Sequence, residues 1–95
     1  MEFNQKMFGQ RIQEARMSRG ITQEEFAEEI DVSSSYYQKL ERGVRTCSLD
    51  ILVCIAEHLH VSTDYLLTGQ KSNAEEMKDA LKASSRLLQE LADSL

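Results

Sequence analysis

Residues 22–43 decide the fold, and they read TQEEFAEEIDVSSSYYQKLERG. All charged residues from position 21 to 32 are acidic, so this segment has a net charge of −5: Glu24, Glu25, Glu28, Glu29 and Asp31. From position 33 to 46 the basic residues outnumber the acid, for a net charge of +2: Lys39, Arg42 and Arg45 against Glu41. An acidic segment therefore stands directly before a hydroxyl-rich, mildly basic one.

The acidic segment has the pattern of a short helix. Thr22 and Glu25 form a capping box, in which each side chain accepts a hydrogen bond from a backbone amide at the helix start. Phe26, Ala27 and Ile30 continue from there as an apolar face at helical spacing. These residues predict a helix that begins just after Thr22.

A second helix is predicted after a short break. Asp31 lies in the break, and Ser33 can cap the helix that follows. Tyr37 and Leu40 would face inward, and Gly43 would end the helix because glycine tolerates positive φ. The remaining face of this helix is polar.

The same signals predict three more helices around this pair. Phe8, Ile12 and Ala15 recur at helical spacing before Gly20, while Ser48 and Ser62 open two later helices, the last of which ends at Gly69. Five short helices then fill residues 6–69, and the fold class is all-α.

A separate amphipathic helix is predicted at the C-terminus. After the polar break GQKSN, Asn73 and Glu76 form another capping box. The apolar residues that follow are spaced by four, seven, three and four: Met77, Leu81, Leu88, Leu91 and Leu95. With Ser84 filling the gap, this is a heptad seam.

Composition narrows the class of protein. The chain has 95 residues, with 41% apolar and 28% charged, as expected for one folded domain. No stretch resembles a membrane span or signal peptide, so we expect a cytoplasmic location and no membrane partner. Cys47 and Cys54 are expected to be reduced thiols, and His58 and His60 are wrongly spaced for a metal site. No cofactor is expected.

The sequence argues against an enzyme, because it has neither a glycine-rich phosphate loop nor histidines at ligand spacing. A capped short helix, a tight turn and a helix with a polar face instead form a helix-turn-helix. In that arrangement the second helix enters the major groove of double-stranded DNA, and the first lies across the groove with its N-terminus near a phosphate.

Several motifs resemble the Cro/C1 type, or XRE family, of transcription regulators, in the family's order and spacing: RIQEAR, GITQEEFAEEI, VSSSYYQKLERG, SLDILVCIAEHL and VSTDYLLTG. The resemblance covers residues 6–69. It implies a five-helix, lambda-repressor-like DNA-binding domain at 1–69. The polar break and the heptad spacing add a linker at 70–73 and the C-terminal helix at 74–95. The implied function is binding to a DNA operator, with repression as the expected outcome.

The resemblance also assigns roles to individual residues. Those matched to base-reading positions, or flanking them, are Ser34, Ser35, Gln38 and Lys39. Those expected at phosphates are Thr22, Gln23, Tyr36, Arg42, Gly43 and Arg45. Arg16 and Glu41 are expected to pair as a brace between helices. The sequence departs from the family at Asp31, where glycine is common, and at Cys47, where proline is frequent.

Operators are read as paired half-sites, so a homodimer is expected. Two surfaces could form it: the face Ile51, Cys54 and His58, or the heptad seam from Met77 to Leu95. An alternative is a protein-interaction or antirepressor module that keeps the fold with little DNA affinity, which the overall charge of −5 favours. Control by a regulatory protein partner, and a redox role for the two thiols, also stay open.

Overall fold

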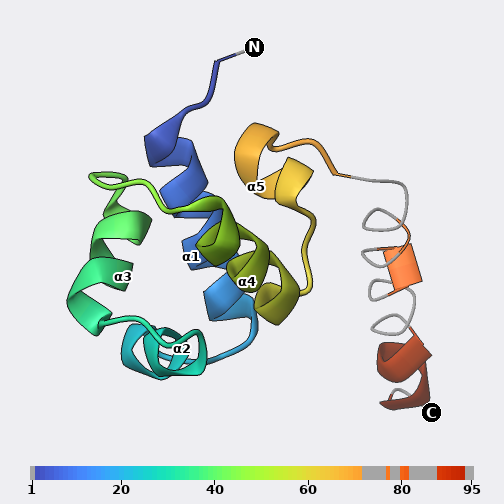
Figure 1. The fold of residues 1–95 in the computed structure, drawn as a ribbon. Coiled ribbons are helices and arrows are strands. Elements are labelled where there is room, and N and C mark those ends of the chain that lie inside the picture. The colour runs from blue at the N-terminus through green and yellow to red at the C-terminus, as the bar shows by residue number, and fades with distance from the viewer. Residues whose placement is uncertain (1, 72–76, 78–79, 82–87, 94–95) are drawn as a thin grey trace.

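The computed structural model describes residues 2–71, 77, 80–81 and 88–93. Five helices follow one another in the first of these ranges (Figure 1): α1 Gln5–Ser18, α2 Gln23–Glu29, α3 Ser34–Arg42, α4 Leu49–Leu59 and α5 Thr63–Thr68. The described residues after position 71 are also helical, and no described residue is in a strand. The predicted all-α class and the five helices are confirmed.

Hydroxyl and amide side chains start each helix. The predicted caps Thr22, Ser33, Ser48 and Ser62 each accept a hydrogen bond from the backbone amide three positions later. The capping box is complete, because the Thr22 amide also donates to Glu25 Oε1 at 3.1 Å. The cap of α1, Asn4, was not predicted. These bonds satisfy amides that would otherwise lack partners at a helix start.

Left-handed residues end the helices. The predicted stops Gly20, Gly43 and Gly69 all have positive φ, and Asp31 adopts φ 58° in the break before α3. His60 also has φ 58° and caps α4, which the sequence did not predict, because no glycine or asparagine marks this helix end. A residue with a Cβ atom therefore adopts here the left-handed conformation that glycine adopts at the ends of α3 and α5.

α1 runs through the middle of the fold and packs against α3, α4 and α5, whereas α2 packs mainly against α3. In Figure 1, α3 lies on the opposite side of the bundle from α5. The predicted inward residues Phe8, Ile12, Phe26, Tyr37 and Leu40 are all buried in one apolar cluster. Burial of this cluster is the main force that holds the short helices together.

Two glycines allow backbones to approach closely. A Cβ at Gly9 would lie 2.4 Å from the Glu41 carbonyl oxygen, so α1 and α3 could not pack as they do with a larger residue there. A Cβ at Gly43 would lie 2.6 Å from the Lys6 Cα, and Gly43 also has φ 75°. The start of α1 thus packs directly on the end of α3.

Tyr37 fills the centre of the cluster. Its side chain is fully buried, and its ring packs on Phe26 with 5.2 Å between ring centroids. Burial raises the pKa of the phenol, with Glu41 adding to the effect. The hydroxyl nevertheless makes no hydrogen bond of acceptable geometry in the described part of the chain. The prediction that Tyr37 faces inward agrees with this position.

The predicted heptad seam is exposed on the described residues that belong to it. Met77, Leu81, Leu88 and Leu91 are 63–67% exposed, so the described chain does not cover this stripe. Ser84 and Leu95, which complete the seam, lie outside the described residues. Among the described residues, no helix is long and apolar enough to cross a membrane.

A surface cluster joins the ends of α1, α2 and α4. Arg19 donates to both carboxylate oxygens of Glu29, at 2.6 and 3.2 Å, and to the His58 carbonyl at 3.0 Å. The His58 ring lies 3.0 Å from Glu29 as well. Hydrogen bonding from Arg19, supported by His58, lowers the pKa of Glu29 below its usual value of 4.5.

Because the folded state favours ionised Glu29, the cluster contributes stability above pH 4.5 and loses it as the pH falls through the lowered pKa. We expect Glu29→Gln to reduce the free energy of unfolding near neutral pH. The deficit relative to the wild type should shrink toward pH 3. Urea denaturation across this pH range measures it.

Glu28→Gln is the matched control for the Glu29 experiment. Glu28 is the exposed neighbour on α2 and has no ion pair within the described part of the chain. A Glu29→Gln deficit that stays constant with pH would show that the carboxylate charge is not what matters.

Candidate nucleic-acid interface

α3 has two faces with different tasks. Tyr37, Leu40 and Glu41 point into the protein and are buried. Ser35, Lys39 and Arg42, four and three positions apart, are exposed on the other side. At 100° per residue these three lie on one stripe opposite the buried face. The polar face predicted for this helix is therefore presented outward.

The residues predicted to read bases do not share one environment. Ser35 and Lys39 lie on the exposed stripe, whereas Ser34 and Gln38 are half-buried at its edge. Ser33, next to them, is occupied as the helix cap and accepts a hydrogen bond from the Tyr36 amide at 3.1 Å. Ser35 and Lys39 are thus the most accessible of the predicted readers.

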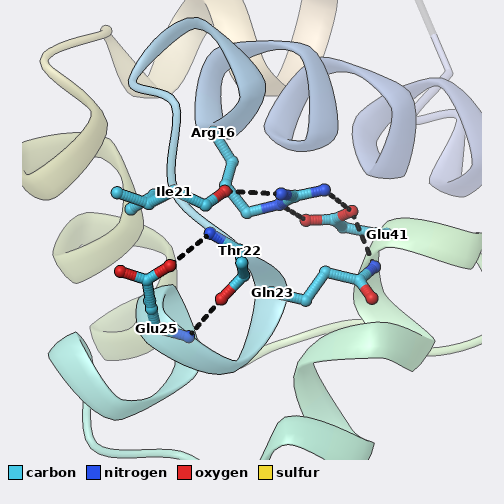
Figure 2. Close-up of polar contacts among 6 residues, drawn as sticks. All are labelled: Arg16, Ile21, Thr22, Gln23, Glu25 and Glu41. Carbon is cyan, nitrogen blue, oxygen red and sulfur yellow. Dashed lines mark hydrogen bonds and ion pairs between the residues drawn. The ribbon is translucent and has the colours of Figure 1, made fainter.

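A buried ion pair holds α3 in place (Figure 2). Arg16 Nε donates to Glu41 Oε2 at 2.7 Å and Arg16 Nη2 donates to Glu41 Oε1 at 3.1 Å. Arg16 Nη1 also donates to the Ile21 carbonyl at 2.7 Å, which fixes the chain just before α2. The two side chains are 9% and 2% exposed. Hydrogen bonding to Glu41 raises the pKa of Arg16, so the guanidinium stays charged.

Gln23 completes this network from the start of α2. Its Nε2 donates to Glu41 Oε1 at 3.0 Å, so three donors surround one carboxylate (Figure 2). The family resemblance implies that Gln23 contacts a phosphate, which stays a prediction, and the structure gives its side chain one partner inside the protein. One donor of the Gln23 amide group remains for an external acceptor.

The network also shapes the charge of the outer surface. Glu41 is the one acid between positions 33 and 46, and it is buried against Arg16. The exposed charges of this segment are therefore all basic: Lys39, Arg42 and Arg45. The side of α3 that faces solvent is more strongly positive than the net charge of the segment predicts.

Breaking the ion pair on one side should be costly, because the other charge is left buried without a partner. We expect Glu41→Gln to reduce the free energy of unfolding by about 3 kcal/mol. The double variant Arg16→Met/Glu41→Leu should lose less than Glu41→Gln alone. Chemical denaturation measures both, and a larger loss in the double variant would contradict the explanation.

Two backbone amides predicted at phosphates are already bonded. The Gly43 amide donates to the Leu40 carbonyl at 3.1 Å, and the Thr22 amide donates to Glu25 in the capping box. Neither backbone amide is therefore a free donor in this structure, and the contact of Thr22 and Gly43 with a phosphate stays a prediction. Gly43 shapes the turn, while Thr22 keeps its hydroxyl hydrogen for an external acceptor.

Sequence reasoning missed the support that the start of α1 gives to this surface. Gln5 Nε2 donates to the Gly43 carbonyl at 2.9 Å, and exposed Lys6 lies against the same glycine. Position 5 and position 43 are 38 residues apart, so no local spacing could reveal this contact. Its only sequence signal was a glycine flanked by two basic residues, Arg42 and Arg45, at the end of α3.

An aromatic contact joins the segment after α3 to the first turn of that helix. The guanidinium carbon of Arg45 lies 5.3 Å from the centroid of the Tyr36 ring. Tyr36 is half-buried against the core, whereas Arg45 is exposed. Both residues were predicted at phosphates, and they lie together beside the exposed stripe of α3.

The first predicted dimer face is only partly accessible. Ile51 and Cys54 are half-buried and pack against the core, and the His58 ring is directed to Glu29.

Cys47 and Cys54 are free thiols, as predicted, and burial raises the pKa of Cys47. A raised pKa disfavours the reactive thiolate form.

The family of this protein follows from its sequence as well as from this geometry. The family model described as Helix-turn-helix matches residues 12–66, which include α2, α3 and α4 in full. The chain belongs to the helix-turn-helix transcriptional regulators of the Cro/C1, or XRE, type. These are DNA-binding proteins, and the fold found here is the lambda-repressor-like one.

Individual relatives agree with this assignment. The chain is 35% identical over 86 residues to the HTH-type transcriptional regulator ImmR of Bacillus subtilis, covering 90% of this chain and 68% of ImmR. The chain spans only 47% and 32% of the lengths of two other curated relatives.

Solved structures share the fold. The P22 c2 repressor in complex with a synthetic operator matches with a TM-score of 0.65 and 28% identity, over 67% of this chain and 97% of the repressor chain. A chain of the SinR/SinI protein complex matches with a TM-score of 0.64 and 30% identity, over 92% of each chain.

Proposed function

We propose that this regulator is a sequence-specific repressor that binds double-stranded DNA as a homodimer, with α3 in the major groove. The observation that carries the proposal is the exposed stripe Ser35, Lys39 and Arg42 on a helix whose other face is fully buried. The likeness to the operator-bound P22 c2 repressor supports this use of the helix.

The chemistry of the exposed stripe fits a division of roles. Lys39 can donate to guanine O6 and N7, whereas Ser35 can bond to more than one base and specifies less. Ser34 and Gln38 would contribute from the edge of the stripe. Base preference would then depend mainly on Lys39.

Phosphate contacts would come from groups around this stripe. Arg42 and Arg45 supply exposed positive charge at the end of α3. The Thr22 hydroxyl and the remaining Gln23 donor stand at the start of α2, where the helix dipole favours an anion. Such contacts fix the orientation of the protein without reading sequence.

The homodimer would be formed by the C-terminal heptad seam. Four of its members on described residues are about two-thirds exposed, and a stripe of this kind is stabilised when a second copy covers it. The half-buried state of Ile51, Cys54 and His58 makes that face of α4 the weaker choice.

Selection from random duplex DNA at about 0.1 M salt tests the proposal. We expect an enriched motif with two-fold symmetry, because two identical subunits read it. Lys39→Ala should then lower discrimination at one position of each half-site by about 1–3 kcal/mol. Arg42→Ala should weaken binding to all sequences alike. Equal effects of the two substitutions would refute the division of roles.

Charge substitutions in the C-terminal stripe test the dimer. We expect Leu88→Glu/Leu91→Glu to convert the full chain to a monomer in sedimentation, because four carboxylates cannot share an apolar seam. Glu90→Gln/Asp93→Asn is the control on exposed neighbours and should leave the mass unchanged. A Leu88→Glu/Leu91→Glu protein that stays dimeric would move the interface to α4.

A second candidate function is an interaction or antirepressor module. Exposed Glu24 in the first turn of α2 favours it, because this carboxylate would stand near a phosphate, and a related fold occurs in the SinR/SinI protein complex. Absence of any enriched sequence in the DNA selection would support this function over the first.

A further inference from the structure

Arg45 lies in a connection without helical support. It is exposed and stands two positions beyond the Gly43 cap, before α4 begins at Leu49. A long side chain in such a segment samples many rotamers, and fixing one of them costs entropy. An arginine that binds DNA from here gains if the protein already holds it in place.

Tyr36 provides a rigid surface for this purpose. Its backbone is fixed in the first turn of α3 by the Ser33 cap, and its ring packs against the apolar core. Burial raises the pKa of the Tyr36 phenol, and the nearby Cys47 adds to this effect, although Arg45 opposes it. The ring is therefore a neutral, immobile platform at physiological pH.

Stacking on such a ring does not use up the donors of an arginine. The guanidinium is planar, so its face contacts the ring while its N–H groups point out at the edge. Those edge donors can form a paired contact with a phosphate. The distance of 5.3 Å between the Arg45 guanidinium carbon and the Tyr36 ring centroid lies within the range of this interaction.

We propose that Tyr36 is a positioning residue, whose ring holds the Arg45 guanidinium where it binds a DNA phosphate. This inference rests on the proposed function, and it replaces the expectation that the Tyr36 hydroxyl itself contacts a phosphate. The ring is the essential part of the side chain, and Arg45 carries the contact.

The stacking can be tested first without DNA. A guanidinium side chain above an aromatic ring has its Cδ protons shielded by the ring current. In NMR spectra of the full chain, we expect the Arg45 Cδ protons upfield of their random-coil position in the wild type and in Tyr36→Phe. They should return to that position in Tyr36→Leu. Random-coil values in the wild type would overturn the inference whatever the DNA result.

A double-mutant cycle then tests the role at DNA, with the sequence selected from random duplexes as the probe. Tyr36→Phe should bind within about twofold of the wild type, because it keeps the ring. Tyr36→Leu should lose about two- to fivefold, as expected for a cation–π contact at an exposed site. Arg45→Ala should lose more and should lower the slope of log affinity against log salt by about 0.9.

Coupling between the two residues decides the outcome. Tyr36→Leu/Arg45→Ala should bind no more weakly than Arg45→Ala alone, since the ring adds nothing to DNA binding once the arginine is absent. Additive losses would overturn the inference. A loss in Tyr36→Phe as large as in Tyr36→Leu would also overturn it, by assigning the contact to the hydroxyl.

Tyr65→Leu is the matched control, because Tyr65 is a half-buried tyrosine on α5. Its loss should leave operator affinity and salt slope unchanged. If Tyr36→Leu does not fold, the substitution Arg45→Lys is measured in its place, in the wild type and in Tyr36→Phe. Unchanged affinity after Arg45→Lys would then count against the platform, since lysine keeps the charge but has no planar face. A wild type that stacks Arg45 but selects no DNA would contradict the proposed function and leave the stacking established.

Discussion

The ion pair between Arg16 and Glu41 is the constraint on which the DNA-facing surface depends. It joins α1 to α3, and Gln23 and the Ile21 carbonyl bring the start of α2 into the same network. All three helices of the site are therefore connected through one carboxylate, that of Glu41. Because a buried carboxylate without partners is costly, the relative placement of these helices is restricted to arrangements that satisfy it.

Close packing makes this network possible. Gly9 lets α1 approach the carbonyl groups at the end of α3, and Gly43 lets the chain turn against Lys6. A side chain at either position would push the two helices apart and lengthen the hydrogen bonds between Arg16 and Glu41. The apolar cluster supplies most of the stability, while the glycines and the ion pair define how the helices are oriented.

Local signals in the sequence predicted the elements well, and contacts between distant residues poorly. Hydroxyl caps such as Thr22 and Ser33 and the glycine stop at Gly43 depend on a few neighbouring residues, so spacing reveals them. The inward direction of Gln23 and the bond from Gln5 to Gly43 depend on how helices pack. The resemblance to a family gave Arg16 and Glu41 as partners, which spacing alone could not have done.

The two faces of α3 differ in how freely they can vary. Tyr37, Leu40 and Glu41 are tied to the interior, so replacing them disturbs the whole domain. Ser35 and Lys39 touch solvent, and surface substitutions of this kind usually cost little stability. Related chains could therefore acquire new target sequences by exchanging a few outward residues on an unchanged scaffold, which makes this helix a suitable starting point for engineering altered recognition.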